Sequence, residues 1–148
     1  MRNLILAILI CFSASANAGV FGGLRIVRIL VEELPDEAKV CGIRKADIET
    51  AAGFVVSQSK LRINENARWY LYYRVFVRYL APVKGCAIYV GLQARMRAIA
   101  EHNKATDWAS FWEYSSFGVV YESDARKEVS DGVDGITKAF LVEWSKDN

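Results

Sequence analysis

The chain has 148 residues, 53% of them hydrophobic, and its 19 basic residues nearly balance 17 acidic ones, which leaves a formal net charge of +2. This balance argues against bulk electrostatic attraction to nucleic acid or to an anionic membrane as the function. The length is that of one domain with a full hydrophobic core.

The first eighteen residues are predicted to be a signal peptide. A short positive start precedes an apolar run from Leu4 to Phe12, and Ala16-Asn17-Ala18 gives the small-x-small pattern of a cleavage site. The run would reach only about 13 Å as a helix, against a bilayer core of roughly 30 Å, so we expect no stable membrane span. Cleavage between Ala18 and Gly19 would leave one periplasmic or secreted domain, residues 19–148. An uncleaved N-terminal anchor is the alternative.

Cys41 and Cys86 remain after removal of the signal and are expected to form a disulfide in an oxidising compartment. Closing about 45 residues would contribute about 4 kcal/mol in the chain-entropy description. Free or metal-binding thiols and pairing with another chain are the alternatives. Cys11 lies within the signal and follows Ile10, which is too large for a lipidation site, so no lipid anchor is expected.

The first half of the mature chain predicts a strand, a helix and a short strand. Residues Leu24 to Val31 are mostly β-branched or aliphatic on both faces, as in a strand inside a sheet. Apolar residues recur at helical spacing from Arg44 to Lys60. Leu61 to Ile63 predicts a second, short strand.

The second half predicts three long strands. Trp69 to Leu80 is rich in Trp, Tyr, Val and Phe, and its odd positions are expected to face the core. Cys86 to Ala100 alternates in the same way and should pair with it as a hairpin. A polar loop from Glu101 to Asp107 leads to a third strand, Trp108 to Tyr121, with an interruption expected near Ser115-Ser116.

The last segment, Glu122 to Trp144, predicts a long amphipathic helix. Its apolar residues fall on one helical face; they are Ala125, Val129, Val133, Ile136, Phe140 and Trp144. Its small residues Gly132, Gly135 and Ala139 are expected to pack against the stretch Ala51 to Gly53 of the first helix. The fold class is therefore α+β, a two-layer sandwich of about four mostly antiparallel strands with two helices on one face, in the order β-α-(β)-β-β-β-α.

No catalytic residue, metal site or cofactor is predicted. His102 is the only histidine and has no G-x-S-x-G turn beside it. A Cys86–His102 thiol pair would require Cys86 to be free of its expected disulfide. The segment Asp131 to Gly135 lacks the oxygen donors that a calcium loop needs at its third and twelfth positions.

The outer sheet face is the candidate binding patch. Alternation places aromatic and arginine side chains together there: Tyr70, Tyr72, Arg74, Phe76, Arg78, Tyr89, Arg95 and Arg97. Arginine forks match phosphate or carboxylate, and aromatic rings stack on flat surfaces, so the patch could hold an anionic envelope component or a protein partner. An ordinary solvated sheet face, with arginine stems lying over tyrosines, is the alternative.

The order of elements resembles a group of short, uncharacterised bacterial periplasmic proteins. The resemblance is carried by short motifs: Cys41-Gly42-Ile43, the strand Trp69 to Leu80, Gly85-Cys86-Ala87, Trp112, and the closing helix with Val129, Val133, Ile136 and Phe140. More distantly, the layout is similar to the lipopolysaccharide-assembly lipoprotein and the N-terminal domain of the Tol-system propeller protein. This resemblance implies binding and positioning of other molecules without catalysis. The chain departs from the anchored lipoproteins in having no cysteine at its expected mature start.

The sequence thus predicts a non-enzymatic binding or accessory protein of the cell envelope, with an unidentified envelope component or protein as partner and no nucleic acid. The alternative is a structural or assembly subunit, including a homo-oligomer, that pairs through a sheet edge. A small hydrolase is the third hypothesis.

Overall fold

The computed structural model describes residues 19–99 and 102–148. The predicted signal peptide and its cleavage site lie outside these residues, apart from Gly19. The order is β1 (Ile26–Val31), α1 (Asp36–Val40), α2 (Lys45–Ser57), β2 (Arg62–Ile63), β3 (Trp69–Leu80), β4 (Gly85–Ile99), β5 (Thr106–Tyr121) and α3 (Ala125–Lys146), with short 3-10 turns at Ala81–Val83 and Glu122–Asp124. In the described residues no helix has the length and hydropathy of a membrane span.

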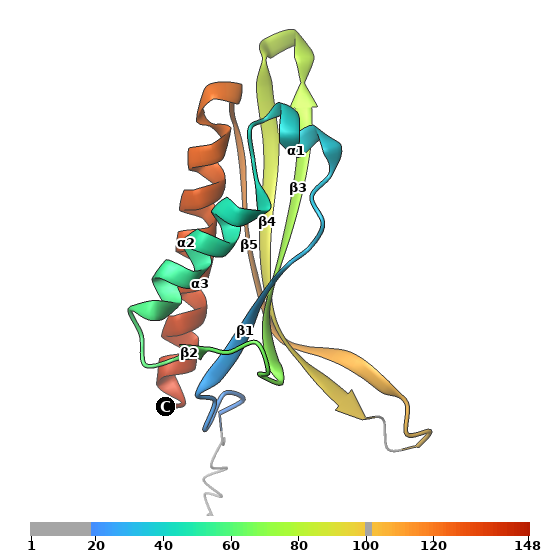
Figure 1. Cartoon of the computed structure of the whole chain (residues 1–148), viewed down its shortest axis with the longest axis vertical. Helices are drawn as coiled ribbons and strands as arrows, with labels where there is room; N and C mark the ends of the chain where they lie inside the picture. Colours follow the sequence, from blue (N-terminus) through green and yellow to red (C-terminus); the bar gives the residue numbers. More distant parts are fainter. Residues whose placement is uncertain (1–18, 100–101) are drawn as a thin grey trace, which may run out of the picture.

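The architecture is the predicted α+β two-layer sandwich, with differences of detail. The sheet has five strands in the order β2-β1-β3-β4-β5. It is mixed, because β1 runs parallel to both β2 and β3 while the β3–β4 and β4–β5 pairs are antiparallel. Helices α2 and α3 form the second layer on one face (Figure 1). The short helix α1, which was not predicted, lies next to β3.

The core lies between this helix layer and the sheet. The odd positions of β3 are buried there as predicted, including Leu71, Tyr73 and Val75. The predicted apolar face of α3 is buried along its whole length. Within the core, the hydroxyl groups of Tyr73 and Thr137 form a hydrogen bond of 2.7 Å, so both buried polar groups have a partner. Packing of the apolar face of α3 against the inward-facing residues of the strands therefore holds the two layers together.

Cys41 and Cys86 form the predicted disulfide, and both are buried. Cys41 ends α1, and Cys86 is the second residue of β4. The bond therefore ties the connection between α1 and α2 to the start of β4. A disulfide of this kind is what a protein outside the cytoplasm carries.

Two predicted details are wrong. The third strand begins at Thr106, and it continues without a register shift through Ser115 and Ser116. The irregularity lies instead opposite Ala94 and Arg95, where Phe111 is the extra residue of β5. A bulge bends the strand that contains it, and Figure 1 shows the β4–β5 hairpin leaving the body near this point as an arm directed away from the helix layer.

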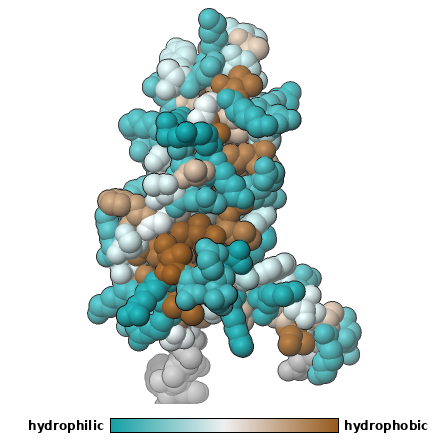
Figure 2. All heavy atoms as spheres, in the orientation of Figure 1, coloured by the Kyte–Doolittle hydropathy of each residue, from teal (hydrophilic) through white to brown (hydrophobic). Residues whose placement is uncertain are grey.

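Surface hydropathy follows the same division between body and arm. Figure 2 shows hydrophobic atoms gathered in the lower half of the body and a mostly hydrophilic upper half, with a small hydrophobic spot near the end of the arm. Ile99, the last residue of β4, is 66% exposed.

Candidate functional site

The register of β3 and β4 brings the eight predicted patch residues onto one face. Directly opposed residues point to the same side of a sheet, and the face here is the one opposite α2 and α3. The opposed pairs on it are Tyr70 with Arg95, Tyr72 with Gln93, Arg74 with Gly91, Phe76 with Tyr89, and Arg78 with Ala87. Arg97 lies one step beyond the start of β3, on the arm, where it opposes Trp108. Whether this face binds a ligand stays a prediction.

Two of the four patch arginines are already paired with carboxylates. Arg74 Nε lies 3.4 Å from Glu32 Oε2, and Arg78 Nη1 lies 3.1 Å from Glu37 Oε1 on α1. The Arg74 guanidinium also lies 5.2 Å from the centre of the Phe76 ring. The charge of this upper half of the patch is therefore compensated within the chain.

Gly91 leaves room for an aromatic ring on the same face. A Cβ atom at this position would lie 2.7 Å from the hydroxyl oxygen of Tyr89, which is too close for a real side chain. The Tyr89 ring thus lies along β4 over Gly91, and it also contacts Phe76 with 5.8 Å between ring centres. The glycine lets the ring lie flat on the strand.

The lower half of the patch is hollowed and differently charged. A depression of about 160 Å³ is lined by Leu30, Tyr70, Tyr72, Arg95 and Trp108. The Arg95 guanidinium is stacked 4.1 Å from the centre of the Tyr72 ring. The rings of Tyr70 and Trp108 meet edge to face at 4.7 Å. A volume of this size corresponds to about five water molecules, which is room for one small ring or an ionised group.

Arg95 and Arg97 have no carboxylate within ion-pair distance in the described part of the chain. Arg97 lies 5.7 Å from the centre of the Trp108 ring. A guanidinium stacked on a ring is held in place while the N–H groups in its plane stay available as donors. These two arginines are therefore oriented and unneutralised, in contrast to Arg74 and Arg78.

Tyr72 is a neutral hydrogen-bonding group beside this depression. Burial raises the pKa of its phenol above the ordinary value, and the nearby carboxylate of Glu32 raises that pKa further. The phenol therefore keeps its proton at neutral pH.

Gln93 carries an unpaired polar atom on the same face. The residue is 7% exposed, and its Oε1 has no hydrogen-bond partner among the described residues. A buried amide oxygen without a donor costs free energy. Gln93 is directly opposite Tyr72 and two residues from Arg95.

Trp108 and Leu30 belong to the depression but were not among the predicted site residues. To place Trp108 opposite Arg97, one must know the length of the loop between β4 and β5 and the position of the bulge at Phe111. A register shift of one residue would move every side chain of β5 to the other face of the sheet. Leu30 joins the face through the parallel pairing of β1 with β3, which brings it opposite Tyr72. Neither pairing has a local sequence signal.

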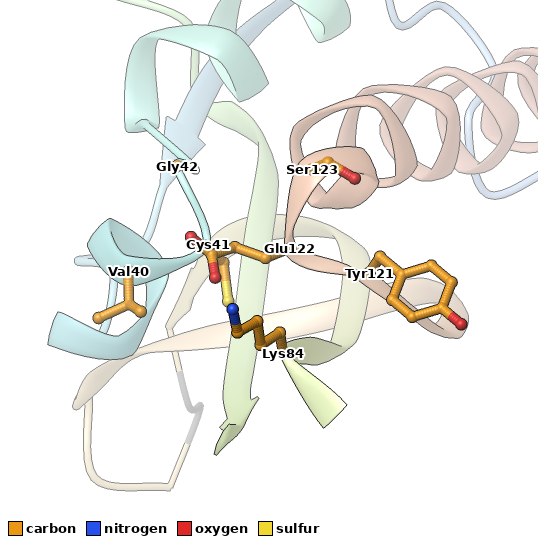
Figure 3. Close-up of a pocket in the computed structure, with 7 residues that line it drawn as sticks. All are labelled: Val40, Cys41, Gly42, Lys84, Tyr121, Glu122 and Ser123. Atoms are coloured by element: carbon orange, nitrogen blue, oxygen red, sulfur yellow. The ribbon is translucent and has the colours of Figure 1, made fainter. Parts of the chain in front are cut away.

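A second depression, of about 480 Å³, lies beside the disulfide. Its lining comes from three parts of the chain: Val40, Cys41, Gly42, Lys84, Tyr121, Glu122 and Ser123. Figure 3 shows the Tyr121 ring pointing away from the group formed by Cys41, Lys84 and Glu122. Lys84 adopts a left-handed backbone conformation with φ of 47°, and its carbonyl accepts a hydrogen bond from the Glu122 amide. This contact joins the turn between β3 and β4 to the segment that precedes α3. The depression therefore lies where three chain connections meet, and nothing in its lining points to a ligand.

The other candidate chemistries are placed as follows. Cys86 is in the disulfide, so its sulfur is not a free nucleophile, and His102 lies exposed in the turn between β4 and β5. Asp131 to Gly135 lies inside α3 as continuous helix. Within residues 19–99 and 102–148 no group of three or more His, Cys, Asp or Glu side chains has a metal-binding arrangement.

Comparison with known proteins finds distant structural likeness only. No family model matches the chain, and no curated protein matches it. A PelC dodecamer from Paraburkholderia phytofirmans is similar over 80% of this chain and 87% of that one, with 15% identity and a TM-score of 0.43. A minor lipoprotein from Acinetobacter baumannii is similar over 84% of this chain and 94% of that one, with 12% identity and a TM-score of 0.40. Likeness at this level is too loose to transfer a function.

Proposed function

We propose that this chain is an exported, non-enzymatic binding or accessory protein of the cell envelope that holds an anionic group on the lower half of its outer sheet face. One observation carries the proposal: Arg95 is stacked on Tyr72 at the rim of a depression, with no carboxylate of the described residues within ion-pair distance. A fixed, uncompensated guanidinium is suited to bidentate recognition of a carboxylate or phosphate.

Two neighbours make the arrangement more specific than a single arginine. Arg97 adds a second uncompensated charge on the arm, above the Trp108 ring. The Tyr72 phenol, which lines the depression, can donate a hydrogen bond to the same ligand or accept one from it. We therefore expect a ligand that carries both an anionic group and a hydrogen-bonding group, such as an acidic sugar or a phosphorylated glycolipid headgroup.

An extracytoplasmic location is supported by two independent features. The Cys41–Cys86 disulfide is stable in an oxidising compartment. The first eighteen residues carry the pattern of an export signal. Envelope components are the anionic molecules that such a protein meets.

A non-enzymatic role is supported by what the depression contains. Its lining supplies a guanidinium, two phenols, an indole and an aliphatic side chain. None of these lining side chains is a carboxylate, an imidazole, a thiol or an amine, the groups that most often serve as general base or nucleophile.

The test compares two pairs of arginines on the same face. Replacement of both Arg95 and Arg97 by Gln should weaken binding of lipopolysaccharide or polygalacturonate at least tenfold, because a charge-assisted hydrogen bond contributes about 1.5–3 kcal/mol. The matched variant replaces Arg74 and Arg78 by Gln and should bind within about twofold of the unchanged protein, since both are paired internally.

Neutral dextran serves as the ligand control, and isothermal titration or surface plasmon resonance gives the affinities. The two anionic probes distinguish a lipid-linked phosphate from a sugar carboxylate. Equal loss in the two double variants would assign the effect to general positive charge. No binding of either probe by the unchanged protein would count against an anion site on this face.

The second candidate function, an assembly subunit that pairs through a sheet edge, is favoured by one separate observation. Strand β5 is sixteen residues long and lies at the edge of the sheet. An edge of this length is a template for another strand.

A further inference from the structure

The two edges of the sheet are protected very differently. At one edge lies β2, which has only two residues. At the other lies β5, whose free side pairs with no strand in the described residues. Natural proteins shorten their edge strands or mark them with lysine and proline. Strand β5 contains no proline, lysine or arginine, and its protective features are the bulge at Phe111 and the acidic residues Asp107 and Glu113.

Residues 113–121 run without irregularity after this bulge and carry exposed apolar side chains on both faces. Phe117, Val119 and Tyr121 alternate along the outer face and are 69%, 58% and 69% exposed. Tyr114, on the helix side, is also exposed. Exposed apolar side chains next to unpaired backbone groups indicate a surface that another β-strand covers.

We propose that this chain forms a two-fold homodimer in which residues 113–121 of β5 pair antiparallel with the same residues of a second copy, centred on Phe117. In this register Phe117 opposes itself, Ser115 opposes Val119, and Glu113 opposes Tyr121. On the helix side, Tyr114 opposes Val120 and Ser116 opposes Gly118. The two sheets become one continuous sheet with all the helices on one side.

The charges of the segment favour a second copy in this register. Glu113 is the only charged residue among the nine, and it has no ion-pair partner in the described residues. Like charges directly opposed in an antiparallel pair are destabilising, and centring on Phe117 avoids this by setting each Glu113 against a tyrosine. The Tyr121 phenol can donate to that carboxylate. The segment is thus complementary to itself.

The size of the interface matches a dimer that depends on concentration. Nine opposed residues give about nine backbone hydrogen bonds, within the range of protein interfaces. Edge pairing covers only one flank of each of the four exposed apolar side chains. Together with the backbone, the total buried area therefore stays below about 1,200 Å², the range of weak and reversible complexes.

The first test is the oligomeric state of the oxidised protein, measured by sedimentation equilibrium over a range of concentrations. We expect a reversible monomer–dimer equilibrium. Phe117→Lys sets two ammonium groups against each other at the two-fold axis and should weaken dimerisation at least tenfold. Phe54→Lys is the matched control, because Phe54 is 63% exposed on α2 and lies outside the proposed interface. A chain that stays monomeric, or a dimer that Phe117→Lys does not weaken, would overturn the proposal.

The second test fixes the register by cross-linking. In Phe117→Cys the two thiols face each other with about 5 Å between Cα atoms, within disulfide reach, and mild oxidation should give a covalent dimer. In Ser115→Cys, on the same face, the two copies of residue 115 are about 13 Å apart and should not cross-link. Equal cross-linking at the two positions would exclude this register. Both tests leave Arg95 and Arg97 unchanged, so failure here and failure of the anion site are distinguishable.

Discussion

Asp47 shows how a single carboxylate joins α2 and α3, the two helices of the helix layer. It lies in the first turn of α2, where its Oδ1 accepts hydrogen bonds from Arg44 Nη2 at 2.9 Å and from Arg126 Nη2 of α3 at 2.7 Å. The side chain is 14% exposed, unlike those of the other acidic residues that form ion pairs in the described chain. The hydrogen bond from Arg44 lowers the pKa of Asp47 most, burial partly opposes this, and the hydrogen bond and positive charge of Arg126 lower the pKa further.

This lowered pKa predicts a pH-dependent contribution to stability. Because the folded pKa lies below the unfolded one, the contribution is complete above the unfolded value of about 4 and is lost as the pH falls through the folded pKa. Asp47→Asn should therefore lower the free energy of unfolding by about 1–2 kcal/mol at pH 7, and the difference should shrink below about pH 3. Urea denaturation at the two pH values measures this. Asp131→Asn, in an exposed pair with Lys127, should change stability by less than about 0.5 kcal/mol.

At the scale of one element, the glycines of α3 have different roles from those predicted. The expectation that Gly132, Gly135 and Ala139 would meet the stretch Ala51 to Gly53 is wrong for the two glycines. A Cβ at Gly132 would lie 3.3 Å from Ser116 Oγ and 3.4 Å from Val90 Cγ2, so this glycine allows close approach to the sheet. A Cβ at Gly135 would have no neighbour within 4 Å. Helical spacing shows that these small residues share one side of α3, but it does not show whether that side faces α2 or the sheet.

These two positions give a matched pair of substitutions within one helix. Gly135→Ala should raise the free energy of unfolding by about 0.5–1 kcal/mol, because alanine loses less backbone entropy in a helix. Gly132→Ala gains the same propensity, but it crowds β4 and β5 and should be less stable than Gly135→Ala by about 1 kcal/mol. Thermal denaturation compares the two variants. Equal stabilisation by both would show that α3 does not approach the sheet closely at Gly132.

At the scale of the whole molecule, local patterns predicted the elements and non-local pairings were missed. Alternation from Trp69 to Leu80 and helical spacing after Glu122 depend on neighbouring residues, and both gave the correct buried faces. The parallel pairing of β1 with β3 joins residues far apart in sequence and has no local signal. The same limit applies to the site: the shared face of Tyr72 and Arg95 followed from alternation, whereas the addition of Trp108 depends on a bulge, and the internal pairing of Arg78 depends on the unpredicted helix α1.

The disulfide is where chain connectivity affects the stability of the whole domain. It links residues separated by 45 positions, and in the chain-entropy description such a bridge contributes about 4 kcal/mol by restricting the unfolded chain. Because both cysteines are buried, the Cys41→Ala, Cys86→Ala double variant removes the bridge without burying a hydroxyl group. Its free energy of unfolding should be lower by about 2–4 kcal/mol in urea denaturation, and added reductant should not change it further. Mass spectrometry after alkylation without reductant should find both cysteines of the unchanged chain unmodified. If the double variant unfolds at the same urea concentration as the oxidised protein, then the packing of α3 on the sheet, and not the bridge, determines the stability of the fold.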